Sequence, residues 1–195
     1  MLILEIKVPN VEQLKDGLLD ALLDKWPSYL AFFIGFFTIL VCWINHHYMF
    51  GRIKTTSHSL ILVNSLTLLA VTFVPFPTAI LSEAFIGGDL QTAVQFFGLT
   101  FILISICYTS LSRFVYNDKG GQYTKEELKY KKGIRVMYSI SIIHTLITFF
   151  VAYVSVFASI ILYIALFSMY LFPIWYTNLV MKFQGQKVDR QKMKH

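Results

Sequence analysis

Long hydrophobic stretches alternate along this chain with short polar and charged segments. The longest lies between Arg135 and Lys182, where 46 residues include no Asp, Glu, Lys or Arg. At ~1.5 Å of rise per residue these residues would reach roughly 70 Å as helix, about twice a ~30 Å hydrocarbon core with a turn between. A soluble core needs no helix pair of that length. The pattern therefore predicts an all-α protein that crosses a membrane several times.

Five of the stretches predict complete transmembrane helices, bounded by prolines, glycines and charges. Their expected ranges are 27–46, 58–75, 91–113, 134–154 and 156–180. Pro27 suits the first position of a helix, whereas Pro75 and Pro77 are expected to end the second span. We expect residues 87–89 (GGD) to form a turn outside the membrane, and Pro173 to kink the last span.

Two shorter elements precede these spans. Residues 1–8 are too few to cross a bilayer, which takes about 20 residues, so they are interpreted as the C-terminal end of a first helix whose beginning is missing. Residues 10–26 predict an interfacial amphipathic helix, capped by Asn10 and Gln13, although a linker packed on other helices fits the same pattern. The whole forms one transmembrane domain over residues 1–182, with a basic tail over 183–195.

Composition and charge agree with a membrane protein and suggest its orientation. Charged residues make up 14% of the chain and the mean hydropathy is +0.60, whereas a soluble domain carries about 25% charge. The segments before residue 27, from 75 to 90 and around 153–159 hold three Lys and seven acids; the rest of the chain holds 14 Lys or Arg and four acids. Because basic loops stay in the cytoplasm, we expect a multi-pass cell-membrane protein with a cytoplasmic C-terminus. Nucleic acid is not an expected partner.

Few polar side chains lie inside the expected spans, and they match no enzyme motif. His46 and His47 point about 100° apart on a helix and lack HxxxH or HExxH spacing, so neither a metal nor a cofactor is expected. Cys42 and Cys107 lie in apolar stretches without metal or disulfide spacing. We find no phosphate loop, nucleophile elbow, paired intramembrane carboxylates or TVGYG filter. The residues alone leave channel, transporter and scaffold open.

Three segments stand out together: residues 2–9 (LILEIKVP), 43–50 (WINHHYMF) and 75–79 (PFPTA), with Asn64 between the last two. They resemble the bacterial branch of the transmembrane protein 175 family, whose members are potassium channels without a TVGYG filter. The resemblance implies six helices per full chain, a homotetramer around the first helix, and potassium ions and the lipid bilayer as partners. It implies a potassium-selective leak channel subunit; a proton-coupled transporter using His47 or His144, or an inactive structural subunit, is the alternative.

The same resemblance assigns roles to individual residues. The family's first helix carries an Arg-x-x-x-Phe-Ser-Asp motif, absent from this sequence, and rings of Ile and Leu that constrict the pore. Leu4 matches the outermost of these hydrophobic positions, Met1 the one before it, and Glu5 the outer mouth. The residues that resemble those holding the motif by hydrogen bonds are Trp43, Asn45, His47 and Asn64. The resemblance thus implies a pore gated by hydrophobic rings, with most of the pore-lining first helix missing from this chain.

Overall fold

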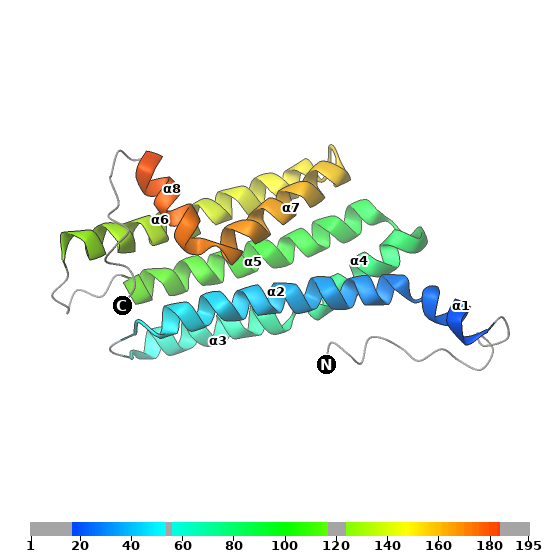
Figure 1. The fold of residues 1–195 in the computed structure, drawn as a ribbon, viewed down its shortest axis with the longest axis horizontal. Coiled ribbons are helices and arrows are strands. Elements are labelled where there is room, and N and C mark those ends of the chain that lie inside the picture. The colour runs from blue at the N-terminus through cyan, green and yellow to red at the C-terminus, as the bar shows by residue number, and fades with distance from the viewer. Residues whose placement is uncertain (1–16, 54–55, 117–123, 184–195) are drawn as a thin grey trace.

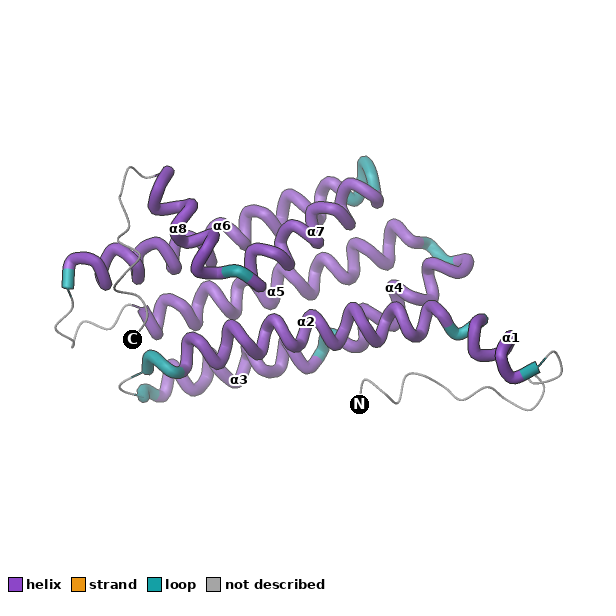
Figure 2. Tube along the Cα trace, viewed as in Figure 1, coloured by secondary structure: helices purple, strands orange, loops and turns teal. Residues whose placement is uncertain are grey.

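The protein is an elongated bundle of α-helices in a computed structural model that describes residues 17–53, 56–116 and 124–183 (Figure 1). Every regular element within these residues is a helix (Figure 2), which confirms the expected all-α fold. The helices are α1 (Leu18–Leu23), α2 (Trp26–Phe50), α3 (His58–Thr72), α4 (Pro75–Gly87), α5 (Leu90–Tyr116), α6 (Lys125–Val151), α7 (Val156–Leu171) and α8 (Pro173–Phe183).

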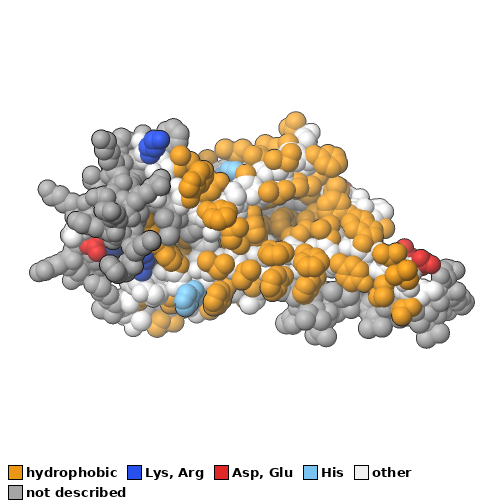
Figure 3. Space-filling view, in the orientation of Figure 1, with side chains coloured by type: hydrophobic (Ala, Val, Ile, Leu, Met, Phe, Trp, Pro, Cys, Tyr) orange, Lys and Arg blue, Asp and Glu red, His pale blue; other side chains and the backbone are white. Residues whose placement is uncertain are grey.

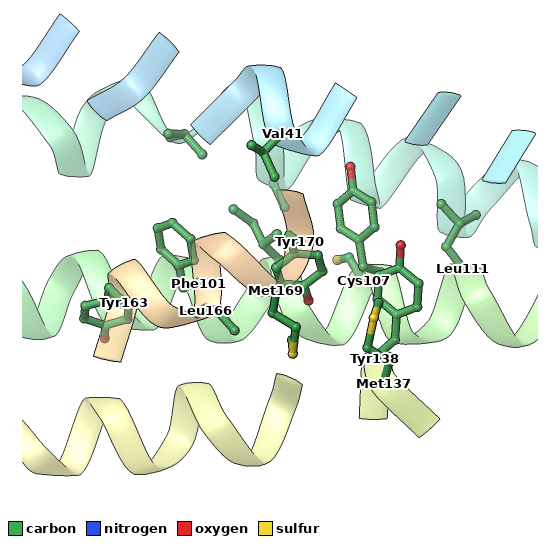
Figure 4. Packing of buried hydrophobic residues seen from close by; sticks show 14 of the residues in the cluster. Val41, Phe101, Cys107, Leu111, Met137, Tyr138, Tyr163, Leu166, Met169 and Tyr170 are labelled. Atoms are coloured by element: carbon green, nitrogen blue, oxygen red, sulfur yellow. The ribbon is translucent and has the colours of Figure 1, made fainter. Parts of the chain in front are cut away.

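Helix α5 is the central element of the bundle. It packs against α3, α4, α6 and α7, while α2 packs mainly against α4 and α7. The long helices run roughly along the long axis of the molecule (Figure 1). A core of aromatic and aliphatic side chains fills the space between α2, α5, α6 and α7 (Figure 4). This core fixes the orientation of α2, which carries three of the four candidate site residues that the structure describes.

Four described segments are long and apolar enough to cross a membrane. They are Leu18–Phe50, His58–Gly87, Leu90–Tyr116 and Tyr130–Val151, with lengths of 33, 30, 27 and 22 residues. Apolar side chains also cover the outer surface along the bundle (Figure 3), as expected where lipid rather than water surrounds the helices. The fifth expected span has a shorter apolar helix, Val156–Leu171. The protein is therefore a multi-pass membrane protein.

The second span was expected to end at Pro75 and Pro77, but the chain is helical again from Pro75 onward. Helix α3 begins at its cap Ser57, whose side chain accepts a bond from the Leu60 amide, and ends at Thr72. Phe73 and Val74 keep helical backbone angles, and Pro75 then starts the 13-residue helix α4. A proline at the first helical position costs no hydrogen bond, since its missing N–H would have no partner there. The segment expected to lie outside the membrane is thus mostly helical.

In the last span, Pro173 was expected to kink one continuous helix, but the helix breaks there instead. Helix α7 ends at Leu171, and Phe172 leaves the helical region with φ −120° and ψ 58°. Helix α8 begins at Pro173 and turns away from the axis of α7 to lie against α6 (Figure 1). The range 156–180 therefore holds two helices.

The N-terminal expectations are only partly open to comparison. Of the expected amphipathic helix over 10–26, the described part is α1, which follows Gly17 at a φ of 109° that favours glycine. Its cap at Asn10 and Gln13, the expected helix end over 1–8 and the tail from 184 onward lie outside the described residues.

Candidate functional site

The candidate residues on α2 point to two opposite sides of that helix. Residues 43 and 47 are one turn apart and share a face, whereas residue 45 is rotated about 200° from residue 43. Trp43 and His47 are exposed and Asn45 is buried. The fourth candidate, Asn64, is half-buried on α3. The structure therefore does not bring these four side chains together into one cluster.

Trp43 and His47 form a stacked pair on the outer face of α2. Their ring centroids are 5.3 Å apart with an interplanar angle of 16°. Trp43 is 60% exposed, so the rest of the described chain leaves this pair largely uncovered. The indole N–H and the imidazole nitrogens can hydrogen-bond to a polar group that approaches this face.

Asn64 is paired with His46, a residue that our sequence analysis did not include in the site. His46 Nε2 lies 2.6 Å from Asn64 Oδ1, so a hydrogen bond requires the proton on Nε2. The His46 ring also stacks on Phe50, with centroids 4.2 Å apart and an angle of 17°. The sequence does not indicate which histidine contacts Asn64, because His46 and His47 are adjacent residues of the same type. The pair joins the C-terminal half of α2 to α3.

Asn45 points into the core and uses its whole amide there. Its Nδ2 donates to the carbonyl oxygens of Val41 (2.8 Å) and Tyr170 (2.6 Å), and its Oδ1 accepts from the Tyr138 hydroxyl (2.9 Å). With two donors and one acceptor engaged, the buried amide avoids the cost of an unpaired polar group, about 1–3 kcal/mol. Asn45 thereby joins α2 to α6 and α7.

Tyrosines surround Asn45 and extend the polar part of the core. The rings of Tyr108, Tyr138 and Tyr170 lie within 5.7–6.2 Å of one another, centroid to centroid, and Figure 4 shows two of them labelled. The Tyr108 hydroxyl donates to the Cys42 carbonyl (2.5 Å) and the Tyr170 hydroxyl to Ser141 Oγ (2.8 Å). These bonds give the hydroxyls of the three tyrosines and the Asn45 amide their partners, as expected of helix contacts in a membrane.

Arg52 links the C-terminal end of α2 to α6. Its Nη2 donates to the Tyr48 hydroxyl (2.7 Å), which lies 2.7 Å from the Tyr130 hydroxyl. The guanidinium carbon lies 4.5 Å from the Tyr48 ring centroid and 5.3 Å from that of Tyr130. Both distances are within the range of cation–π attraction.

Other candidate chemistry adds little. Met1, Leu4 and Glu5 lie outside the described residues. In the part of the chain that the structure describes, no group of His, Cys, Asp and Glu could hold a metal ion, and both cysteines are free thiols. His144 Nε2 lies 2.9 Å from the Leu162 carbonyl oxygen, a contact between α6 and α7. The site thus consists of helix-packing contacts and one exposed aromatic pair on a multi-pass helical membrane protein.

Comparisons with known proteins identify the family. A family model described as "Endosomal/lysosomal potassium channel TMEM175" matches residues 1–75. The crystal structure of a lysosomal potassium-selective channel TMEM175 homolog from Chamaesiphon minutus is 32% identical in sequence, with a TM-score of 0.73. That match covers 91% of this chain and 88% of the other. The chain belongs to the TMEM175 family, which confirms the resemblance drawn from its sequence.

Two curated relatives are both named potassium channels. One, from Chamaesiphon minutus, is 44% identical over 112 residues, which are 57% of this chain and 55% of that protein. The other, from Streptomyces collinus, is 34% identical over 113 residues, 57% of this chain and 54% of that protein. The matched part thus spans about half the length of these relatives. The family is described as a channel, in agreement with our expectation that the chain is not an enzyme.

Proposed function

We propose that this chain is a subunit of a potassium-selective channel in the cell membrane. The observation that carries the proposal is its similarity to a potassium-selective channel, at 32% identity over 91% of the chain. The names of the two curated relatives support the same ion. Apolar spans and the absence of enzyme motifs from the sequence agree with passive transport across the membrane.

The proposed pore lies between four copies of the chain, as the family resemblance implies. Rings of Met1 and Leu4 constrict it, and Glu5 attracts cations to the outer mouth. Apolar rings gate by excluding water, and they favour an ion that gives up its hydration readily. Potassium does so more easily than sodium. The basic C-terminal part of the chain lies in the cytoplasm, on the argument from its Lys and Arg content.

The Trp43–His47 pair is the proposed contact between α2 and the pore-lining segment. Its exposure in the single chain supports this role, because an indole and an imidazole facing lipid would leave their polar atoms without partners. Asn64, which is hydrogen-bonded to His46, is the proposed contribution of α3 to the same contact with the pore-lining segment. Asn45 contributes from the buried side by fixing α2 in the bundle.

Potassium flux from proteoliposomes tests this proposal, with two tryptophans as a matched pair. Trp43 is 60% exposed on α2, and Trp175 is 59% exposed on α8. We expect the purified chain to pass potassium in preference to sodium, Trp43→Ala to reduce the flux about tenfold or more, and Trp175→Ala to leave it nearly unchanged. Equal losses in both variants would contradict the assigned role of Trp43.

A second arm of this assay tests the hydrophobic ring. Leu4→Asn would let water remain in a constriction formed by that residue, so the potassium flux should rise and the selectivity should fall. Ile3→Asn is the control, because residue 3 would point about 100° away from residue 4 on a helix. Proton flux that saturates would instead indicate a transporter, and no flux at all in any form would indicate a structural subunit.

A further inference from the structure

The break between α7 and α8 leaves backbone carbonyls of α7 without partners inside that helix. The last four carbonyls of any α-helix have no partner within that helix, and in α7 these belong to residues 168–171. The Phe172 amide serves one of them, donating to the Ser168 carbonyl at 3.0 Å. Pro173 has no N–H to offer to the carbonyl four residues earlier. In a membrane, side chains from neighbouring helices must supply the missing donors.

Asn45 supplies one such donor from another helix. Its Nδ2 reaches the Tyr170 carbonyl at 2.6 Å, across 125 positions of sequence. The amide cannot easily rotate away, because Val41 and Tyr138 hold its other polar positions. At 1% exposure, Asn45 is also shielded from competing water. It therefore acts as a C-terminal cap for α7 that is provided by α2.

Side-chain hydrogen bonds of Tyr176 and Thr177 hold α8 on the other side of the break. The Tyr176 hydroxyl lies 2.8 Å from Ser168 Oγ, which links α8 back to α7. Thr177 Oγ1 donates to Met137 Sδ on α6 at 3.7 Å, and a thioether is a weak acceptor. Leu171 and Phe172, at the break itself, are exposed. A change in the backbone angles at Phe172 would therefore disturb little buried surface at Leu171 and Phe172, but it would also shift α8 along α6, against which α8 packs.

We propose that the α7–α8 junction is a hinge, and that Asn45 is the positioning residue that locks its α7 side to α2. Hinges use a few residues at element ends that can absorb a change in backbone angles, and Phe172 is in that position. Because Asn45 and the Trp43–His47 pair lie on opposite sides of one helix, a rotation of α2 moves both. The hinge would then link the position of α8 to whatever contacts the outer face of α2. This inference does not depend on which ion the protein carries.

Hydrogen exchange of the full chain in lipid nanodiscs tests the hinge. Asn45→Leu keeps the side-chain size but removes the bond to Tyr170. Amides over 168–176 should then exchange on the order of tenfold faster, as expected for one lost hydrogen bond. Ser159→Ala is the matched control, since it removes a buried bond between α7 and α6, from Ser159 Oγ to the Thr148 carbonyl (3.0 Å). It should speed exchange near residues 148–159 and leave 168–176 unchanged.

Two further variants keep the test decisive. Tyr138→Phe removes a bond to Asn45 but leaves the bond to Tyr170, so exchange over 168–176 should change much less than in Asn45→Leu. If Asn45→Leu does not fold, Tyr176→Phe replaces it, because this half-buried side chain braces the other side of the break. The hinge is refuted if the folded Asn45→Leu variant, or Tyr176→Phe in its place, exchanges over 168–176 like the parent chain. It is equally refuted if Ser159→Ala speeds that exchange as much.

Discussion

Gly98 on α5 lies directly beneath the hydroxyl of Tyr163 on α7, so even one added methyl group should be felt. A Cβ at residue 98 would overlap the Tyr163 hydroxyl oxygen, and it would lie 3.3 Å from both Tyr163 Cζ and Phe149 Cδ2. The Tyr163 ring cannot swing away freely. It packs edge-on against Phe97 (5.6 Å, 88°) and tilted against Phe101 (5.6 Å, 45°).

The expected change in unfolding free energy for Gly98→Ala follows from two opposing effects. Overpacking a filled core costs about 1–3 kcal/mol, while replacing Gly by Ala inside a helix gains about 1 kcal/mol. Because the overlap is with a side chain pinned on two sides, we expect Gly98→Ala to lose about 1–2 kcal/mol of unfolding free energy. Once Tyr163→Phe has removed the hydroxyl, the remaining 3.3 Å contacts need only a small adjustment. Gly98→Ala should then be neutral or stabilising by up to about 1 kcal/mol.

Thermal unfolding of the four combinations in detergent micelles measures this coupling. For a chain of this size, each 1 kcal/mol corresponds to about 2–4 °C. Gly87→Ala is the control, since a Cβ there would meet no atom within 4 Å, and its effect should stay within about 0.5 kcal/mol. The reasoning fails if Gly98→Ala lowers the unfolding temperature as much with Tyr163→Phe as without it, because the hydroxyl would then not be the obstacle.

Two helix caps formed by exposed side chains give further predictions. Thr124 and Glu127 form a capping box at the start of α6, so Thr124→Ala should cost about 1 kcal/mol in thermal unfolding, whereas Thr124→Ser should cost much less; equal losses would argue against the cap. Asp89 accepts bonds from the Thr92 hydroxyl and amide, which lower the pKa of its carboxyl. The stabilisation by the ionised Asp89 carboxylate should be complete above the ordinary carboxyl pKa, and it should disappear as the pH falls through the lowered pKa of Asp89. The stability of the parent chain relative to Asp89→Asn, which keeps a good cap, should therefore decrease between about pH 6 and pH 3; a constant difference would contradict this.

Much of the fold follows from local features of the sequence. Apolar stretches of about 20 residues must be helical in a bilayer, because no other open structure satisfies the backbone there. The prolines at 27, 75 and 173 all lie at or next to helix starts. Local geometry does not say how the chain continues beyond a proline, however. For this reason α4 was not predicted from the sequence, and a kink was expected where α7 and α8 separate.

The tertiary structure alone decided which side of each helix faces the protein. In water, the apolar face of a helix identifies the core, but lipid is as apolar as a protein core, so both faces of a membrane helix are hydrophobic. The family resemblance grouped Trp43, Asn45 and His47 as one set, although Asn45 faces Tyr138 and Tyr170 while the other two face outward. The partners of Asn45 lie 93 and 125 positions away, and only the packing of α2, α6 and α7 brings them together.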